Sequence, residues 1–166
     1  MKNRTEQLSI EKTEPYGNAC VFTGHRELSP SFKESALKKE VKNLIKQGVT
    51  TFYNGGAMGF DLIAAECVLA LKKKNPNVKL IVCVPCADQD KKFSADDKKR
   101  YAKILQDCDE KILLAEHYFK GCMQVRNRYM VDRAAHMIAH FYKDTGGTAF
   151  TVNYFKKIRK KDPVFV

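Results

Sequence analysis

The segment VTTFYNGGAMGFDLIAAECVLAL, residues 49–71, contains the pattern from which the fold follows. Residues 49–53 are β-branched and aromatic, which predicts a strand. Three glycines fall in the turn at 54–59. The apolar residues of 60–71 cover nearly every side of a helix, which predicts that this helix is buried. A strand that passes through a glycine-rich turn into a helix is the building unit of a parallel α/β sheet.

The same alternation of strand and helix continues on both sides of this segment. Short apolar runs predict the other strands at 19–23, 78–84, 111–115 and 137–142, with a short edge strand at 163–166. The first helix is expected to begin at Ser29-Pro30-Ser31 and to end at Gly48, and others are expected at 96–108, 121–135 and 146–158. The expected fold is therefore α/β: a Rossmann-like, doubly wound parallel sheet of about five to six strands with helices on both faces.

The length of 166 residues fits one domain, which we expect over residues 18–166. Residues 1–17 mix charges of both signs, and we expect a loosely ordered lead-in there. No apolar run approaches the ~20 residues that a membrane helix needs. The first residues also lack the apolar core of a signal peptide. These features predict a cytoplasmic protein with no membrane partner.

The formal net charge of +11 favours anionic partners such as nucleotides, nucleic acids or acidic surfaces. The lysines and arginines are spread over several predicted helices and the C-terminal tail. Such a spread is typical of solvated helix faces. A surface that binds nucleic acid is the alternative interpretation.

Six cysteines lie mostly inside apolar runs, a pattern that favours a reducing compartment over a disulfide framework. Cys83 and Cys86 form a C-x-x-C, but Cys83 falls inside a predicted strand and Pro85 precedes Cys86. A redox dithiol normally lies past the strand, at the start of a helix. No second pair has the spacing to complete a zinc site. We expect buried thiols and no metal site, and the role of this pair stays open.

The loop after the first strand carries the first group of candidate residues. Ligands bind beyond the carboxyl ends of the strands in sheets of this kind. Gly24 lets the backbone approach a ligand closely, and Arg26 can hold a phosphate or a carboxylate with two hydrogen bonds. His25 can donate to an anion or act as an acid or base. We therefore predict a binding site at Thr23, Gly24, His25 and Arg26.

The loop after the second strand is the glycine-rich turn of the opening segment. It is neither the G-x-G-x-x-G of dinucleotide-binding folds nor a P-loop, so classical NAD binding and ATP hydrolysis are weakly supported. Backbone N–H groups at the start of the following helix can still bind an anion. Asp61 is predicted either to cap the helix or to contact ribose hydroxyls. The candidate residues here are Gly55, Gly56, Ala57, Gly59 and Asp61.

Two later loops complete the predicted site. Arg126 and Asn127 fall early in the fourth helix, where their side chains can reach over the strand tips. Gly146 and Gly147, followed by Thr148, form a second glycine pair that opens a helix, and therefore a second candidate anion site. Two such turns in one small domain favour a phosphate-bearing ligand.

These motifs, in this order and spacing, resemble the SLOG superfamily, which includes DprA/Smf and the LOG cytokinin-activating enzymes. The likeness is greatest to its YpsA/YoqJ-like bacterial branch and covers about residues 18–160. It rests on 23–26, 55–61 with 64–66 behind it, 126–127 with 130–132, and 146–148. The resemblance implies a pocket for nucleotides or nucleotide-derived signals.

The resemblance implies three alternative functions. In the LOG enzymes a similar late glycine motif is followed by a catalytic glutamate, and the enzymes release a base from a nucleoside monophosphate. Residues 148–152 contain no acid, so Asp61 or Glu66 would have to supply the carboxylate of such a phosphoribohydrolase or N-glycosidase. We therefore expect binding or sensing of a nucleotide-type ligand instead, with no cofactor required. Single-stranded DNA binding, as in DprA, is the second alternative, and a homo-oligomer stays open.

Overall fold

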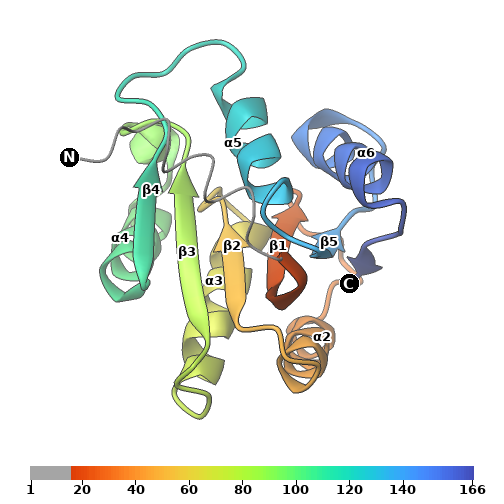
Figure 1. Cartoon of the computed structure of the whole chain (residues 1–166). Coiled ribbons are helices and arrows are strands. Elements are labelled where there is room, and N and C mark those ends of the chain that lie inside the picture. Colours follow the sequence, from red (N-terminus) through yellow and green to blue (C-terminus); the bar gives the residue numbers. More distant parts are fainter. Residues whose placement is uncertain (1–15) are drawn as a thin grey trace, which may run out of the picture.

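Six parallel strands form one sheet through the centre of the molecule (Figure 1), in the order β4-β3-β2-β1-β5-β6. The computed structural model describes residues 16–166, so the lead-in expected at 1–17 lies almost wholly outside the described residues. The strands are β1 Ala19–Gly24, β2 Thr51–Asn54, β3 Lys79–Val84, β4 Glu110–Leu113, β5 His136–His140 and β6 Val164–Phe165. This arrangement confirms the predicted Rossmann-like α/β fold.

Five α-helices cover the two faces of the sheet. They are α2 Glu34–Lys46, α3 Phe60–Lys72, α4 Ala95–Asp107, α5 Cys122–Val131 and α6 Gly146–Arg159. The helices α2, α3 and α4 lie on one face, and α5 and α6 pack together on the other (Figure 1). Two short 3-10 turns, η1 Tyr16–Asn18 and η2 Gln89–Lys92, lie before β1 and after β3. None of the helices within residues 16–166 combines the length and apolar character needed to cross a membrane.

The strands β1, β3 and β5 are buried on both faces because their side chains alternate between two cores. In β1, Phe22 packs with the core under α2, α3 and α4, whereas Val21 packs with the core under α5 and α6. In β3, Val82 and Cys83 divide in the same way. This period of two, with both faces covered, explains why the strands appear in the sequence as continuous apolar runs. All six cysteines are free thiols.

Two helix boundaries differ from those expected. The helix expected to begin at Ser29-Pro30-Ser31 begins at Glu34 instead, because the Ser29 N–H donates to His140 Nε2 (3.1 Å) and Lys33 is extended. The second difference is at the end of α5, which ends at Val131 and not at residue 135. There the N–H groups of Arg133 and Ala134 bond three residues back, which tightens the last turn before β5. The remaining boundaries agree closely.

The strand order places a switch point beside β1. The chain runs from β1 outward through β2 and β3 to β4, and then returns to the other side of β1 as β5. The loops after β1 and β5 therefore diverge to opposite faces and leave a crevice at their carboxyl ends. Ligands of open α/β sheets bind in such a crevice.

Gly24, the last residue of β1, is required by packing. A Cβ there would overlap the ring of Phe60, which is fully buried at the start of α3. We expect Gly24→Ala to lower the free energy of unfolding by about 1–3 kcal/mol, the usual cost of overpacking a core. Urea unfolding measures the change, with Gly17→Ala as the control because nothing lies within 4 Å of its Cβ position. Equal destabilisation of both variants would contradict this explanation.

Candidate functional site

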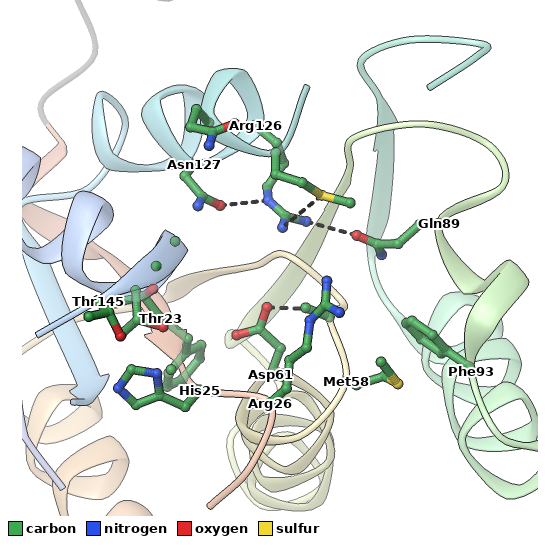
Figure 2. Close-up of a pocket in the computed structure, with 18 residues that line it drawn as sticks. Thr23, His25, Arg26, Met58, Asp61, Gln89, Phe93, Arg126, Asn127 and Thr145 are labelled. Carbon is green, nitrogen blue, oxygen red and sulfur yellow. Dashed lines mark hydrogen bonds between the residues drawn. The ribbon is translucent and has the colours of Figure 1, made fainter. Parts of the chain in front are cut away.

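A pocket of about 380 Å³ lies beyond the carboxyl end of β1, where α3, α5 and α6 begin (Figure 2). It collects residues from four of the loops that the sequence singled out. The predicted residues that line it are Thr23, Gly24, His25, Arg26, Ala57, Asp61, Arg126, Asn127, Gly146, Gly147 and Thr148. Gly55, Gly56 and Gly59 do not line it.

The glycines of the turn after β2 serve the protein's own packing. A Cβ on Gly55 would overlap the guanidinium of Arg126. Gly59 has a φ of +80°, and the backbone of Arg26 passes directly against it. The turn is also fixed by the buried Asn54, whose amide donates to the Asp61 carbonyl (2.8 Å) and whose Oδ1 accepts from the Gly56 N–H (2.7 Å). This turn therefore positions Asp61, and its residues Ala57 and Met58 line the pocket.

The carboxyl of Asp61 is buried and only partly satisfied. Its Oδ2 accepts from the Ala57 N–H (3.2 Å), but Oδ1 has no hydrogen-bond partner among the described residues. The residue is 6% exposed. Burial raises the pKa of Asp61 to about 6, against the charge of Arg126 and the Ala57 N–H, which both lower it. A buried acceptor without a donor is costly unless something else supplies the donor.

Arg126 is buried above Asp61 and braces the walls of the pocket. Its Nη1 donates to the carbonyl of Gly55, to that of Cys83 (3.3 Å) and to Gln89 Oε1 (3.1 Å). Its Nε donates to Asn127 Oδ1 (2.7 Å). Burial lowers the pKa of Arg126, while the nearby Asp61 acts in the opposite direction. Arg126 thus contributes a fixed positive charge to the pocket, with most of its donors already used.

His25 organises the loop between β5 and α6. Its Nε2 lies 3.4 Å from the Tyr142 N–H and 3.3 Å from the Lys143 N–H, and accepts from both. Burial, His140 and Lys143 lower the pKa of His25. A nitrogen that accepts hydrogen bonds carries no proton, so the ring is neutral in this arrangement. His25 therefore holds two backbone N–H groups and does not offer Nε2 as a donor to an anion.

Arg26 is the unengaged cation of the site. Its side chain is exposed, lines the pocket and has no hydrogen-bond or ion-pair partner in the described part of the chain. Figure 2 shows it rising beside Asp61 toward the open space below Gln89. A free guanidinium at a cavity wall can form two charge-assisted hydrogen bonds to a phosphate.

The start of α6 forms the opposite wall. Thr145 precedes the helix without making a side-chain cap, and the first turn contains no acid. Gly146 has a φ of +80°, whereas Gly147 has an ordinary φ and nothing within 4 Å of its Cβ position. The first N–H groups of a helix lack partners within it and carry partial positive charge. No contact among residues 16–166 requires glycine at 147, so its missing side chain leaves space at these N–H groups.

Comparison of the whole sequence with known proteins shows the family. The family model YpsA, described as the YspA SLOG family, matches residues 18–165. The chain belongs to this family. The SPbeta prophage-derived protein YoqJ of Bacillus subtilis (strain 168) is 36% identical over 137 residues, 75% of this chain and 80% of that protein. The UPF0398 protein BH1768 of Halalkalibacterium halodurans is 27% identical over 139 residues, 82% of this chain and 72% of that protein.

Two solved structures of DNA processing protein A (DprA) have the same fold. The Helicobacter pylori protein, described for its single-stranded DNA binding mode, has a TM-score of 0.63 at 22% identity. The match covers 89% of the present chain and 64% of the Helicobacter pylori chain. The Streptococcus pneumoniae DprA has a TM-score of 0.63 at 18% identity, with 49% of its chain covered by 89% of this one. The present chain thus spans about half to two thirds of the DprA chains, and the likeness establishes a shared fold.

Four other residues of the pocket beyond β1 were not predicted from the sequence. Met58, Gln89, Phe93 and Met123 also line it. Gln89 and Phe93 come from the segment after β3, and Gln89 donates to the carbonyls of Gly55 (3.1 Å) and Gly56 (3.2 Å). The rule that ligands bind beyond the strands points to this segment, but it contains no glycine or anion-binding motif to single out these two residues.

Glu66, the other candidate carboxylate, lies away from the SLOG pocket. It pairs with Arg100 of α4 and is not among the residues that line the site. Asp61 is the one acid in the lining. No group of three or more metal-binding side chains occurs within residues 16–166.

Proposed function

We propose that this pocket binds a nucleotide or nucleotide-derived ligand through its phosphate and its sugar, in a binding or sensing role. The observation that carries the proposal is the buried, unpartnered Oδ1 of Asp61, in a pocket that also holds a free Arg26 and an uncapped helix start. The pocket thus offers an acceptor at Asp61, a cation beside it at Arg26, and N–H donors at the start of α6. A nucleotide carries both hydroxyl donors, on its sugar, and a phosphate, so it can use all of these groups.

The phosphate would bind at the start of α6. The N–H groups after Gly146 and the helix dipole favour a dianion there, and the hydroxyls of Thr145 and Thr148 lie on the same lining. Arg26 would close the site from the β1 side. The open space at Gly147 allows a phosphate oxygen to reach the backbone.

The sugar would face Asp61. An ionised carboxylate only accepts hydrogen bonds, so it selects hydroxyl or N–H donors and repels phosphate. We therefore expect a nucleotide to lie with its sugar at Asp61 and its phosphate toward the start of α6. A ribose hydroxyl that donates to Oδ1 would supply the partner that the protein lacks.

Base release is the second candidate function, and Asp61 is the observation that favours it. A buried carboxyl with a pKa raised to about 6 has the character of a general acid or base near neutral pH. Residues 148–152 contain no acid, so Asp61 would act without a second carboxylate in the pocket lining. Incubation of the protein at high concentration with nucleoside monophosphates, followed by chromatography of free base, tests this activity. Release that Asp61→Asn abolishes would establish it.

Isothermal titration with a nucleoside 5′-monophosphate, the same nucleoside and inorganic phosphate tests the binding proposal. We expect the monophosphate to bind at least tenfold more tightly than the nucleoside, since charge-assisted contacts are worth about 1.5–3 kcal/mol. A panel of all common bases that shows no binding would refute the proposal.

Arg26→Ala should weaken binding of the monophosphate about 10- to 100-fold, because it removes the free guanidinium from the pocket. Binding of the nucleoside should change little. The matched control is Arg128→Ala, which removes the same charge from the exposed side of α5, outside the pocket. Equal loss in both variants would show a general charge effect and would remove Arg26 from the site.

A further inference from the structure

A second cavity, of about 510 Å³, adjoins the site and shares a wall with it. Five residues line both cavities: Arg26, Met58, Gln89, Phe93 and Met123. The second cavity adds further residues of the segment after β3, and Tyr118 from the loop before α5. In Figure 2, Met58 and Phe93 lie on the far side of Arg26 from Thr23 and Thr145. The two cavities therefore meet along these five shared residues, of which Arg26 is the one cation.

The second cavity is walled by apolar and aromatic side chains. Phe93 is 9% exposed, and its ring is held edge-on against Tyr101 at 5.5 Å between centroids. Tyr118, which lines this cavity and not the first, is 62% exposed. Met58, Met123 and Cys86 are the other apolar residues of the lining. Flexible methionines and aromatic rings form an adaptable surface for a flat ring.

Positive charge lies at the rim of this cavity. Lys91 and Lys92 are exposed, and with Arg26 they give three cations against one acid, Asp88, in the lining. A simple phosphate tail would match these cations but would leave the aromatic walls unused. A second nucleoside attached through phosphate matches both features, since its ring can stack while the linking phosphates stay near the cations.

We propose that this second cavity is a subsite for a second nucleoside, so that the ligand is a pair of nucleosides joined through phosphate, with the linking phosphate at Arg26. The inference rests on the proposed function, because it places the first nucleotide in the first pocket. Arg26 borders both spaces and is free to bind the link between them. Tyr118 provides a stacking surface that has no other role in the described structure.

Calorimetric titration tests the proposal by comparing two compounds. One is a nucleoside 5′-monophosphate, and the other is a dinucleoside in which the same nucleoside is joined 5′ to 5′ to a second copy by pyrophosphate; adenosine and guanosine versions of both are used. We expect the dinucleoside to bind at least tenfold more tightly than the monophosphate of the same base, because stacking of one further base typically gives about a tenfold gain. Tyr118→Ala should remove most of this gain and leave the affinity for the monophosphate unchanged.

The control is Phe119→Ala, which removes the neighbouring aromatic side chain, 46% exposed and outside both cavities. A second variant, Lys92→Ala, should weaken binding of the dinucleoside about threefold, and the loss should be larger at low salt. Lys98→Ala, at an exposed lysine outside both cavities, is its control. Both Tyr118 and Lys92 are exposed, so these variants should fold normally.

Three results would overturn the inference. If the monophosphate binds and the dinucleoside binds no more tightly, the second subsite is wrong while the proposed function stands. If the affinity of oligodeoxyadenylates keeps rising with length beyond two nucleotides and exceeds that of the dinucleoside, the groove serves single-stranded nucleic acid. If neither probe binds, the proposed function fails, and the second subsite fails with it.

Discussion

Asp61→Asn is expected to stabilise the fold while it weakens binding of a nucleotide at least tenfold. The carboxylate is buried, and its Oδ1 has no partner among the described residues, so its ionisation in the native state costs free energy. Asparagine has the same size, and its oxygen can still accept from the Ala57 N–H. Residues that cost stability in this way are retained where function needs them.

The pH dependence of stability follows from the raised pKa of Asp61. The unfolded chain loses this proton near the ordinary value of 3.8, whereas the folded protein loses it at about 6. Between these pH values the native state binds more protons than the unfolded state, so the free energy of unfolding falls as pH rises through this window. At pH 7 the ionised group costs about 1–3 kcal/mol, which Asp61→Asn should recover, whereas at pH 4 the variant should gain little.

Urea unfolding at pH 4 and pH 7 measures this effect. The control is Asp132→Asn, at an exposed carboxylate that accepts from the Tyr154 hydroxyl (2.6 Å) far from the pocket lining. Nucleoside 5′-monophosphate should bind the Asp61→Asn protein at least tenfold more weakly, because a hydroxyl loses a charged acceptor. Inorganic phosphate should bind as well as before or better, since a negative charge has been removed. An Asp61→Asn protein that is less stable at pH 7, or that binds the nucleotide normally, would show that Asp61 has a structural role.

Proton binding at Asp61 should also affect ligand affinity. A ligand that donates to the carboxylate binds the ionised form, so affinity should fall as pH drops below about 6. The phosphate of the ligand also titrates near this pH. Asp61→Asn separates the two effects, because only the contribution of the carboxyl disappears in the variant.

Gly147→Asp is expected to weaken phosphate binding at least 100-fold without lowering the free energy of unfolding. The position has an ordinary φ and open space around its Cβ, so the side chain can be accommodated. An acid in the first turn of α6 interacts favourably with the helix dipole, by about 0.3–1 kcal/mol. The same acid would stand beside the bound phosphate, where like charges cost several kcal/mol.

The matched control is Asn153→Asp, which adds the same charge at an exposed position further along α6. Titration with inorganic phosphate, nucleoside and nucleotide distinguishes the two ends of the site. Gly147→Asp should lose phosphate and nucleotide but keep the nucleoside, whereas Asp61→Asn should keep phosphate. Phosphate binding that survives Gly147→Asp would exclude the start of α6 as the anion site. Gly56 is a poor target for such a test, because its φ is +65° and Tyr101 occupies the space of a side chain.

Local patterns in the sequence were sufficient for the architecture. Continuous apolar runs that alternate with helical segments, and glycine turns that lead into helices, predict a parallel sheet covered on both faces. The rule for ligand sites in these sheets then selects the loops at 23–26, 55–61 and 146–148 and the helix start at 126–127, and the pocket contains residues from each of them but not Gly55, Gly56 or Gly59. The same motifs also pointed to the family that the comparisons show.

The roles of the individual residues depend on contacts between distant segments. The two arginines Arg26 and Arg126 look equivalent in the sequence. In the structure Arg126 donates to the carbonyl of Gly55, 71 residues away, whereas the Arg26 side chain has no hydrogen-bond partner among the described residues. His25 is neutral because backbone groups more than a hundred residues later donate to it. Asp61 lies in the pocket and Glu66, one turn further along α3, pairs with α4 instead. Burial and hydrogen-bond partners set charge and availability, and neither can be deduced from local sequence, because both arise only when the sheet brings its loops together.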